Sequence, residues 1–148
     1  NIVWESKTEI LLLLAARYEH YKKVIKPAME KGKLVICDRF IDSTIAYQCN
    51  NNQLLKNFCY TVYKTILGDF KPDLTILLDI DPIVTLDRIK KRNIKNRFDN
   101  KNFDYFTNIR NEYIKIAEKL SRVKVFNANS DKDLISSEII NLIIKKID

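Results

Sequence analysis

An acid and a base follow an apolar run in the first third of the sequence. Asp38 and Arg39 come directly after residues 34–37, and the pattern then turns helical. In open α/β sheets, ligands bind outside the carboxyl ends of the strands. A carboxylate there can hold a metal ion or its water shell, and a guanidinium can form a bidentate contact with a phosphate. An Asp-Arg pair alone is a weak signal of a ligand site, because the two side chains could instead form a local ion pair with each other.

The spacing after Arg39 strengthens the hypothesis of a phosphate site. If the chain is helical from Asp38 onward, Arg39, Ser43 and Tyr47 recur every fourth residue on one face, with Gln48 beside Tyr47. That face offers a guanidinium, two hydroxyls and an amide, which suits a phosphorylated nucleoside. A polar, solvated helix face is the alternative.

Arg17 is a second candidate and is predicted to lie on the first helix. Leu13 and Leu14 lie one turn before it and Tyr21 one turn after it, so Arg17 falls on or beside the apolar stripe. A guanidinium there needs an anion or a carbonyl partner, because an unpaired buried charge is costly. Arg17 therefore binds a ligand, pairs with an internal acid, or extends its guanidinium to solvent.

Residues 88–97 form a basic segment with six Lys or Arg residues and no acid. A basic loop that closes on a polyphosphate has this composition, and so does a nucleic-acid surface. Aromatic side chains interleaved with the basic ones are expected in a single-strand-binding module, and this segment contains none. An ordinary solvated run of charge is the third alternative.

The elements that must position these residues alternate between strands and helices. Three apolar runs, 34–37, 74–78 and 123–126, are predicted as buried parallel strands. Helical patterns cover 6–31, 53–67, 82–92, 103–120 and 131–147, with Pro27 as a kink or restart and Gly32 and Gly68 as stops. This order predicts an α/β fold, a parallel sheet with flanking helices, in a single domain of 148 residues.

The composition narrows the class of partner. The net charge of +7 favours nucleic acid, anionic membranes or phosphorylated small molecules. Three cysteines and one histidine have no metal-site spacing, so we expect reduced thiols in the cytoplasm. The longest apolar run, residues 10–16, has seven residues, so neither a signal peptide nor a membrane span is predicted.

The ordered set of motifs resembles bacterial thymidylate kinases from end to end. The shared motifs, in chain order, are Ala15-Ala16-Arg17, Lys26-Pro27-Ala28, Asp38-Arg39-Phe40, Ser43, Ala46-Tyr47-Gln48, Gly68-Asp69-Phe70-Lys71-Pro72-Asp73-Leu74, Leu78-Asp79, Arg92 with Arg97, and Phe103-Asp104-Tyr105-Phe106. The resemblance implies a P-loop nucleoside-monophosphate kinase fold and the conversion of ATP and dTMP to ADP and dTDP, with Mg²⁺. It also implies dTMP and ATP as partners and a homodimer, without nucleic acid or membrane.

The resemblance further implies roles in the dTMP half of the site. Arg17 is similar to the Arg that bonds the thymine ring, and Arg39 to the Arg on the dTMP phosphate. Gln48 matches the amide that reads the thymine edge, and Ser43 and Tyr47 resemble other members of the dTMP pocket.

Roles on the phosphate side follow from the same resemblance. Asp38 is similar to the acid near the phosphates and Mg²⁺, which it holds directly or through water. Arg92 and Arg97 match the lid, about residues 88–102, where family members place a basic residue over the transferred phosphate. The residues expected to take part in catalysis are therefore Asp38, Arg39, Arg92 and Arg97. Arg92 and Arg97 are also expected to take part in ATP binding.

The sequence departs from the family pattern at three places. Leu13 stands where many members have a Phe that stacks on thymine, so an aliphatic contact is expected there. Cys49-Asn50-Asn51-Asn52 replaces a usually glycine-rich stretch, which leaves the shape of that loop open. No Gly-x-x-x-x-Gly-Lys-Ser/Thr motif occurs, although the family places this loop after its first strand. We expect a chain that begins beyond that strand and is inactive alone.

Three other interpretations remain open. A related deoxynucleoside kinase shares the acid-Arg arrangement at the strand end, although residues 68–73 and Ala46-Tyr47-Gln48 favour thymidylate kinase. A non-catalytic remnant is compatible with the absence of the phosphate loop. A basic nucleic-acid-binding module is the least favoured.

Overall fold

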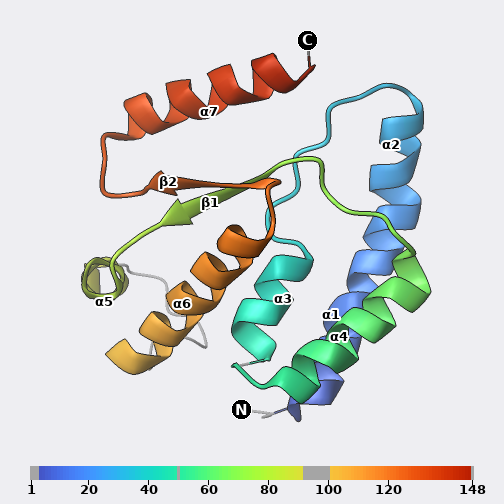
Figure 1. The fold of residues 1–148 in the computed structure, drawn as a ribbon, viewed down its shortest axis with the longest axis horizontal. Helices are drawn as coiled ribbons and strands as arrows, with labels where there is room; N and C mark the ends of the chain where they lie inside the picture. The colour runs from blue at the N-terminus through green and yellow to red at the C-terminus, as the bar shows by residue number, and fades with distance from the viewer. Residues whose placement is uncertain (1–3, 50, 92–100, 148) are drawn as a thin grey trace. The chain divides into compact units, whose positions relative to one another are not determined.

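The structure is a computed structural model and describes residues 4–49, 51–91 and 101–147. The chain divides into two compact units, residues 1–71 and residues 72–148, and each is described here by itself. Figure 1 shows the helices and strands of both. Within the described residues, no helix has both the length and the apolar composition that crossing a membrane requires.

The first unit is helical. Helix α1 (Ser6–His20) continues through the π-helical turn η1 (Tyr21–Ile25) into α2 (Lys26–Glu30), and α3 (Ile41–Gln48) and α4 (Gln53–Leu67) follow. Helix α1 packs against α3 and α4. Ile10, Leu14, Ile45 and Cys59 are fully or almost fully buried, so the core of this unit lies between these three helices.

The long first helix confirms the prediction for residues 6–31, including an irregularity at Pro27. Proline has no N–H, and its ring clashes with the carbonyl oxygen four residues earlier. The widened π turn at Tyr21–Ile25 comes immediately before α2, which has Pro27 at its start. Gly32 and Gly68 have φ values of +68° and +63° and follow α2 and α4, as predicted for helix stops.

The second unit contains a parallel pair of strands. Strands β1 (Thr75–Asp79) and β2 (Val123–Asn127) pair in register, with Thr75 opposite Val123 and Asp79 opposite Asn127. Helices α5 (Pro82–Lys91) and α6 (Phe103–Lys119) lie between the strands in sequence, and α7 (Lys132–Ile147) follows them. Helix α6 packs against both strands, and α6 and α7 flank them on opposite sides (Figure 1). The α/β class with a parallel sheet is confirmed.

One predicted strand is wrong. Residues 34–37 form no strand, and Leu34 and Ile36 are 62% and 82% exposed. A strand exists only where a neighbour accepts and donates its backbone hydrogen bonds. The sheet formed by the described residues consists of β1 and β2, so residues 34–37 have no such neighbour among them. The apolar composition of residues 34–37 favours an extended conformation, but the sequence does not reveal whether another strand pairs with them.

Candidate functional site

Helix α1 places Leu13 and Arg17 at the edge of its buried stripe. Ile10 and Leu14 are completely buried on this helix, while Leu13 and Arg17, one turn apart, are half-buried. The predicted position of Arg17 beside the apolar stripe is therefore confirmed. A side chain at such an edge keeps its aliphatic stem against the core and directs its charged end toward polar groups.

Arg17 reaches the hydroxyl group of Thr44 on α3. Arg17 Nη1 donates a hydrogen bond to Thr44 Oγ1, and Thr44 has no exposed surface. The sequence analysis missed Thr44. The two residues are 27 positions apart, and only the packing of α1 against α3 brings them together.

Arg39 lies outside the helix on which it was predicted. Helix α3 begins at Ile41, and Arg39 precedes it in a bend with a φ of +63°. Arg39, Ser43 and Tyr47 therefore do not occupy three successive turns of one helix. The turn nevertheless brings two of them together, because the Arg39 guanidinium carbon lies 4.9 Å from the centroid of the Tyr47 ring.

The backbone of Arg39 is in an unusual conformation for a residue with a side chain. Left-handed φ values at non-glycine residues cost on the order of 1–3 kcal/mol and cluster at ligand-binding positions. The surrounding structure must hold Arg39 in this turn. The conformation is consistent with a functional role for its guanidinium, which the cation–π contact with Tyr47 orients.

Helix α3 is a buried helix, so the alternative of a solvated polar face is wrong. Residues 41–46 are all buried, and Ser43 and Gln48 are each only 8% exposed. Tyr47 is half-buried. A hydroxyl and an amide in such surroundings can discriminate between ligands, because an analogue that fails to bond them leaves a buried polar group unpaired.

The loop after Gln48 uses asparagine in place of glycine. Asn51 has a φ of +60°, a conformation that asparagine adopts more readily than most residues. The Asn52 side chain then accepts hydrogen bonds from the backbone N–H groups of Leu54 and Leu55, at 2.9 and 3.2 Å, and caps α4. The departure from a glycine-rich stretch is therefore compatible with a tight loop.

Asp38 and Cys37 lie at the end of the extended segment, and both are exposed. Desolvation of its sulfur raises the pKa of the Cys37 thiol, the Arg17 guanidinium opposes the rise, and Asp38 adds to it. Arg17 thus acts electrostatically on this segment as well as on α3. All three cysteines are free thiols.

A single exposed carboxylate limits the kind of metal site that Asp38 can form. The described residues contain no group of three or more His, Cys, Asp or Glu side chains that could hold a metal ion. Mg²⁺ is commonly held by one or two carboxylates, its remaining positions being filled by water and substrate phosphates. Asp38 fits that arrangement and does not fit a metal enclosed by protein ligands.

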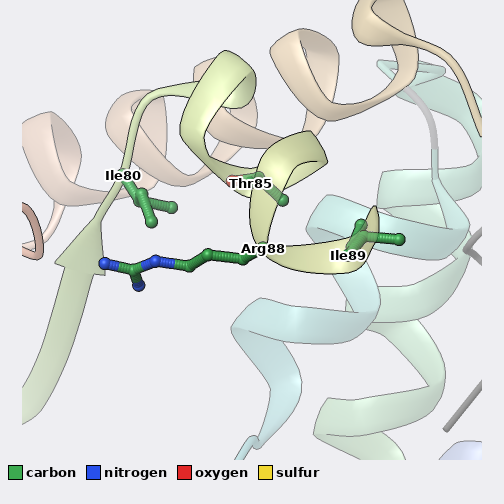
Figure 2. A pocket seen from close by; sticks show the side chains of 4 residues that line it. All are labelled: Ile80, Thr85, Arg88 and Ile89. Carbon is green, nitrogen blue, oxygen red and sulfur yellow. The ribbon is translucent and has the colours of Figure 1, made fainter. Parts of the chain in front are cut away.

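In the second unit, the described part of the basic segment belongs to α5. Arg92 and Arg97 lie outside the described residues. Arg88 Nη2 donates to the carbonyl oxygen of Ala128 at 3.3 Å, and Lys90 Nζ is 4.0 Å from Asp87 Oδ1. Figure 2 shows the Arg88 side chain beside Ile80 at a shallow pocket of about 280 Å³, which Thr85 and Ile89 also line.

The acid at the end of β1 has a specific partner. Arg110 of α6 contacts Asp79 in a bidentate pair, with Nε to Oδ1 at 2.7 Å and Nη2 to Oδ2 at 2.8 Å. The Arg110 hydrogen bonds hold the pKa of Asp79 below its ordinary value. Sequence reasoning singled out Asp79 and missed Arg110, which is 31 residues away and carries no local signal. The pair connects β1 to α6.

Comparison with known proteins connects this arrangement to one family. Residues 2–139 match the family model of thymidylate kinase. The thymidylate kinase of Orientia tsutsugamushi (strain Ikeda) is 37% identical over 147 residues, which cover 95% of this chain and 67% of that protein. That of Clostridium novyi (strain NT) is 38% identical over 142 residues, covering 94% of this chain and 69% of that one.

A solved structure agrees with these sequence matches. The crystal structure of thymidylate kinase from Ehrlichia chaffeensis superimposes with a TM-score of 0.74 at 28% sequence identity. The match covers 96% of this chain and 67% of the Ehrlichia chain. The family model, the curated relatives and the fold agree, and the chain belongs to the thymidylate kinase family, whose members are ATP-dependent kinases.

Proposed function

We propose that this chain carries the dTMP-binding half of an enzyme that transfers a phosphoryl group from ATP to dTMP, giving dTDP and ADP. The observation that carries the proposal is the convergence of Arg17 and Arg39 on helix α3, in a chain whose relatives are named thymidylate kinases. Two guanidinium groups beside a buried polar helix suit a ligand with a phosphate at one end and a polar ring at the other.

The proposed roles divide along the nucleotide. Arg17 and Gln48 bond the thymine edge, and Leu13 packs against the ring. At the other end Arg39 binds the phosphate, positioned by its contact with Tyr47. The Ser43 hydroxyl completes the pocket.

Asp38 is the proposed protein group for Mg²⁺, which supplies charge neutralisation on the phosphates when it is bound. Asp38 holds the ion directly or through its water shell, consistent with a single exposed carboxylate. We place Arg92 and Arg97 in a lid, residues 88–102, over the phosphoryl group that ATP donates. Two guanidinium groups there would stabilise the charge of the transition state without making a covalent contact.

We further propose that residues 1–148 alone do not turn over dTMP. Phosphoryl transfer depends on positioning and charge stabilisation, and a Gly-rich loop with its Lys supplies much of both to the β- and γ-phosphates. The sequence of 148 residues contains two glycines and no such motif. A cytoplasmic location, expected from the cysteine content, and a homodimer, implied by the family resemblance, remain predictions.

The test uses a kinase in which residues 1–148 follow a Gly-rich phosphate-binding segment of the family, referred to below as the loop-bearing kinase. ADP formation is measured with ATP, Mg²⁺ and either dTMP or dCMP. We expect a higher kcat/KM for dTMP. Equal turnover of the two nucleotides would count against a kinase specific for dTMP and would favour a broader deoxynucleoside-monophosphate kinase. No turnover with either nucleotide would favour a non-catalytic remnant.

A further inference from the structure

Thr44 is an unusual partner for a charged side chain. It lies in the middle of α3, has no exposed surface, and accepts a hydrogen bond from Arg17 Nη1. A buried hydroxyl that loses a hydrogen-bond partner costs free energy, and so does a half-buried guanidinium that loses one of its acceptors. The contact therefore matters to both helices that form it.

The two ends of this contact differ in stiffness. Arg17 has a long side chain with several rotatable bonds, and its position on α1 fixes only the start of that chain. Thr44 is β-branched and buried in a helix, so its hydroxyl has few orientations. The threonine is thus the fixed end, and the hydrogen bond selects among the orientations that the Arg17 guanidinium can adopt.

An arginine that bonds a nucleotide base must hold the plane of its guanidinium group in the correct orientation. The guanidinium is planar, and its donors point in fixed directions within that plane. A rotation of the plane moves every donor relative to the ligand, so binding weakens even though the charge stays in place. If the Arg17 side chain rotated freely, ordering it on ligand binding would cost conformational entropy, and the ligand would bind less tightly.

We propose that Thr44 is a positioning residue that holds the Arg17 guanidinium in the plane in which it bonds the nucleotide base. The proposal rests on the proposed function, since it assigns Arg17 to the dTMP base. Thr44 acts through Arg17 and is not a catalytic residue.

The experiment compares Thr44→Val, which keeps the shape and removes the hydroxyl, with Thr44→Ser, which keeps the hydroxyl. Both are made in the loop-bearing kinase, with and without Arg17→Ala. We expect Thr44→Val to raise KM for dTMP about tenfold or more, as fits a lost hydrogen bond to a charged group, with kcat and KM for ATP nearly unchanged. Thr44→Ser should stay within about threefold of the wild type, and Thr44→Val should add nothing to Arg17→Ala.

A second measurement needs no turnover. The rate of guanidinium rotation of Arg17 is measured by NMR in the loop-bearing kinase and in its Thr44→Val and Thr44→Ser variants that retain Arg17. A hydrogen-bonded guanidinium rotates slowly. We expect slow rotation in the wild type and Thr44→Ser and faster rotation in Thr44→Val. This readout still decides whether Thr44 holds Arg17 if the wild-type kinase fails to act on dTMP, in which case the proposed function itself is wrong.

Three results would overturn the proposal. Equal guanidinium rotation in the wild type and Thr44→Val would mean that Thr44 does not hold Arg17. An equal effect of Thr44→Val with and without Arg17→Ala would mean that Thr44 acts independently of Arg17. A Thr44→Ser variant as poor as Thr44→Val would mean that the methyl group, and not the hydroxyl, is what the site requires.

Discussion

Arg39 combines a strained backbone with an oriented charge. Its φ of +63° and its contact with the Tyr47 ring place one guanidinium at the start of α3. We predict that Arg39→Ala in the loop-bearing kinase lowers kcat/KM for dTMP. The loss corresponds to about 2–4 kcal/mol of transition-state stabilisation, because a charge-assisted contact to phosphate is lost. Arg39→Lys is the control, because lysine keeps the charge and loses the bidentate geometry. Its kcat/KM for dTMP should lie between those of the wild type and Arg39→Ala. An Arg39→Ala variant with unchanged kcat/KM would remove Arg39 from the site.

Leu13 stands where the family resemblance implies a Phe that stacks on thymine. It is half-buried and lies one turn from Arg17 on α1. We predict that Leu13→Phe folds and tightens dTMP binding by roughly 0.5–1.5 kcal/mol, because an aromatic ring adds stacking to the burial already present. Titration of the loop-bearing kinase with dTMP measures this, and Leu13→Met serves as the non-aromatic control. A large loss of affinity in a well-folded variant would mean that Leu13 does not face the base.

The helical period located Arg17 and Leu13 but could not identify their partners. Three to four residues per turn show which side of a helix faces inward, so the border position of Arg17 followed from Leu14 and Tyr21. Thr44 was missed because its contact with Arg17 depends on how two helices pack. The contact of Arg110 with Asp79 likewise depends on how α6 packs against β1, so the sequence around Asp79 does not reveal its partner.

At the scale of elements, α4 begins at a side-chain cap within the asparagine-rich loop. Asn52 accepts hydrogen bonds from two backbone N–H groups of the first turn, those of Leu54 and Leu55. We predict that Asn52→Ala lowers the free energy of unfolding by about 0.5–2 kcal/mol, and that Asn52→Asp, which keeps an acceptor, stays close to the wild type. Thermal melting of the loop-bearing kinase and its variants measures the difference. Equal melting temperatures for all three proteins would contradict a stabilising cap.

Helices were predicted more accurately than strands for a physical reason. The hydrogen bonds of a helix lie within the segment, so periodicity and stop residues such as Gly68 delimited α4 as residues 53–67, which is its observed span. A strand bonds to another segment, and residues 34–37 had the composition of a strand without a partner among the described residues. The start of α3 was misplaced because nothing local revealed the left-handed turn at Arg39.

At the scale of the whole molecule, the Asp79–Arg110 pair gives stability a dependence on pH. The Arg110 hydrogen bonds lower the pKa of Asp79 from its ordinary 3.8, so the folded state favours the charged carboxylate. The stabilisation is present above the unfolded-state pKa and is lost as pH falls through the lower folded-state value. We predict that Asp79→Asn lowers the free energy of unfolding by about 1 kcal/mol at pH 7, a modest value because Arg110 is 39% exposed.

The pH series provides the control for that prediction. The free energy of unfolding of the wild type should exceed that of Asp79→Asn by a constant amount from pH 7 down to about pH 5. This difference should shrink below pH 4, because Asp79 in the wild type becomes protonated. Chemical unfolding of the loop-bearing kinase at several pH values measures it. A difference that grows at low pH would mean that Asp79 is not stabilised in its charged form.

The central claim is that Arg17, Arg39 and helix α3 form the nucleotide site of a dTMP kinase. The most direct test is ADP formation with dTMP and with dCMP, measured for the loop-bearing kinase and for residues 1–148 in parallel. The account predicts turnover by the loop-bearing kinase at a typical kinase rate, roughly 1–100 per second, with a clear preference for dTMP, and no turnover by residues 1–148. Equal use of dTMP and dCMP, or full activity of residues 1–148 without a phosphate-binding loop, would contradict it.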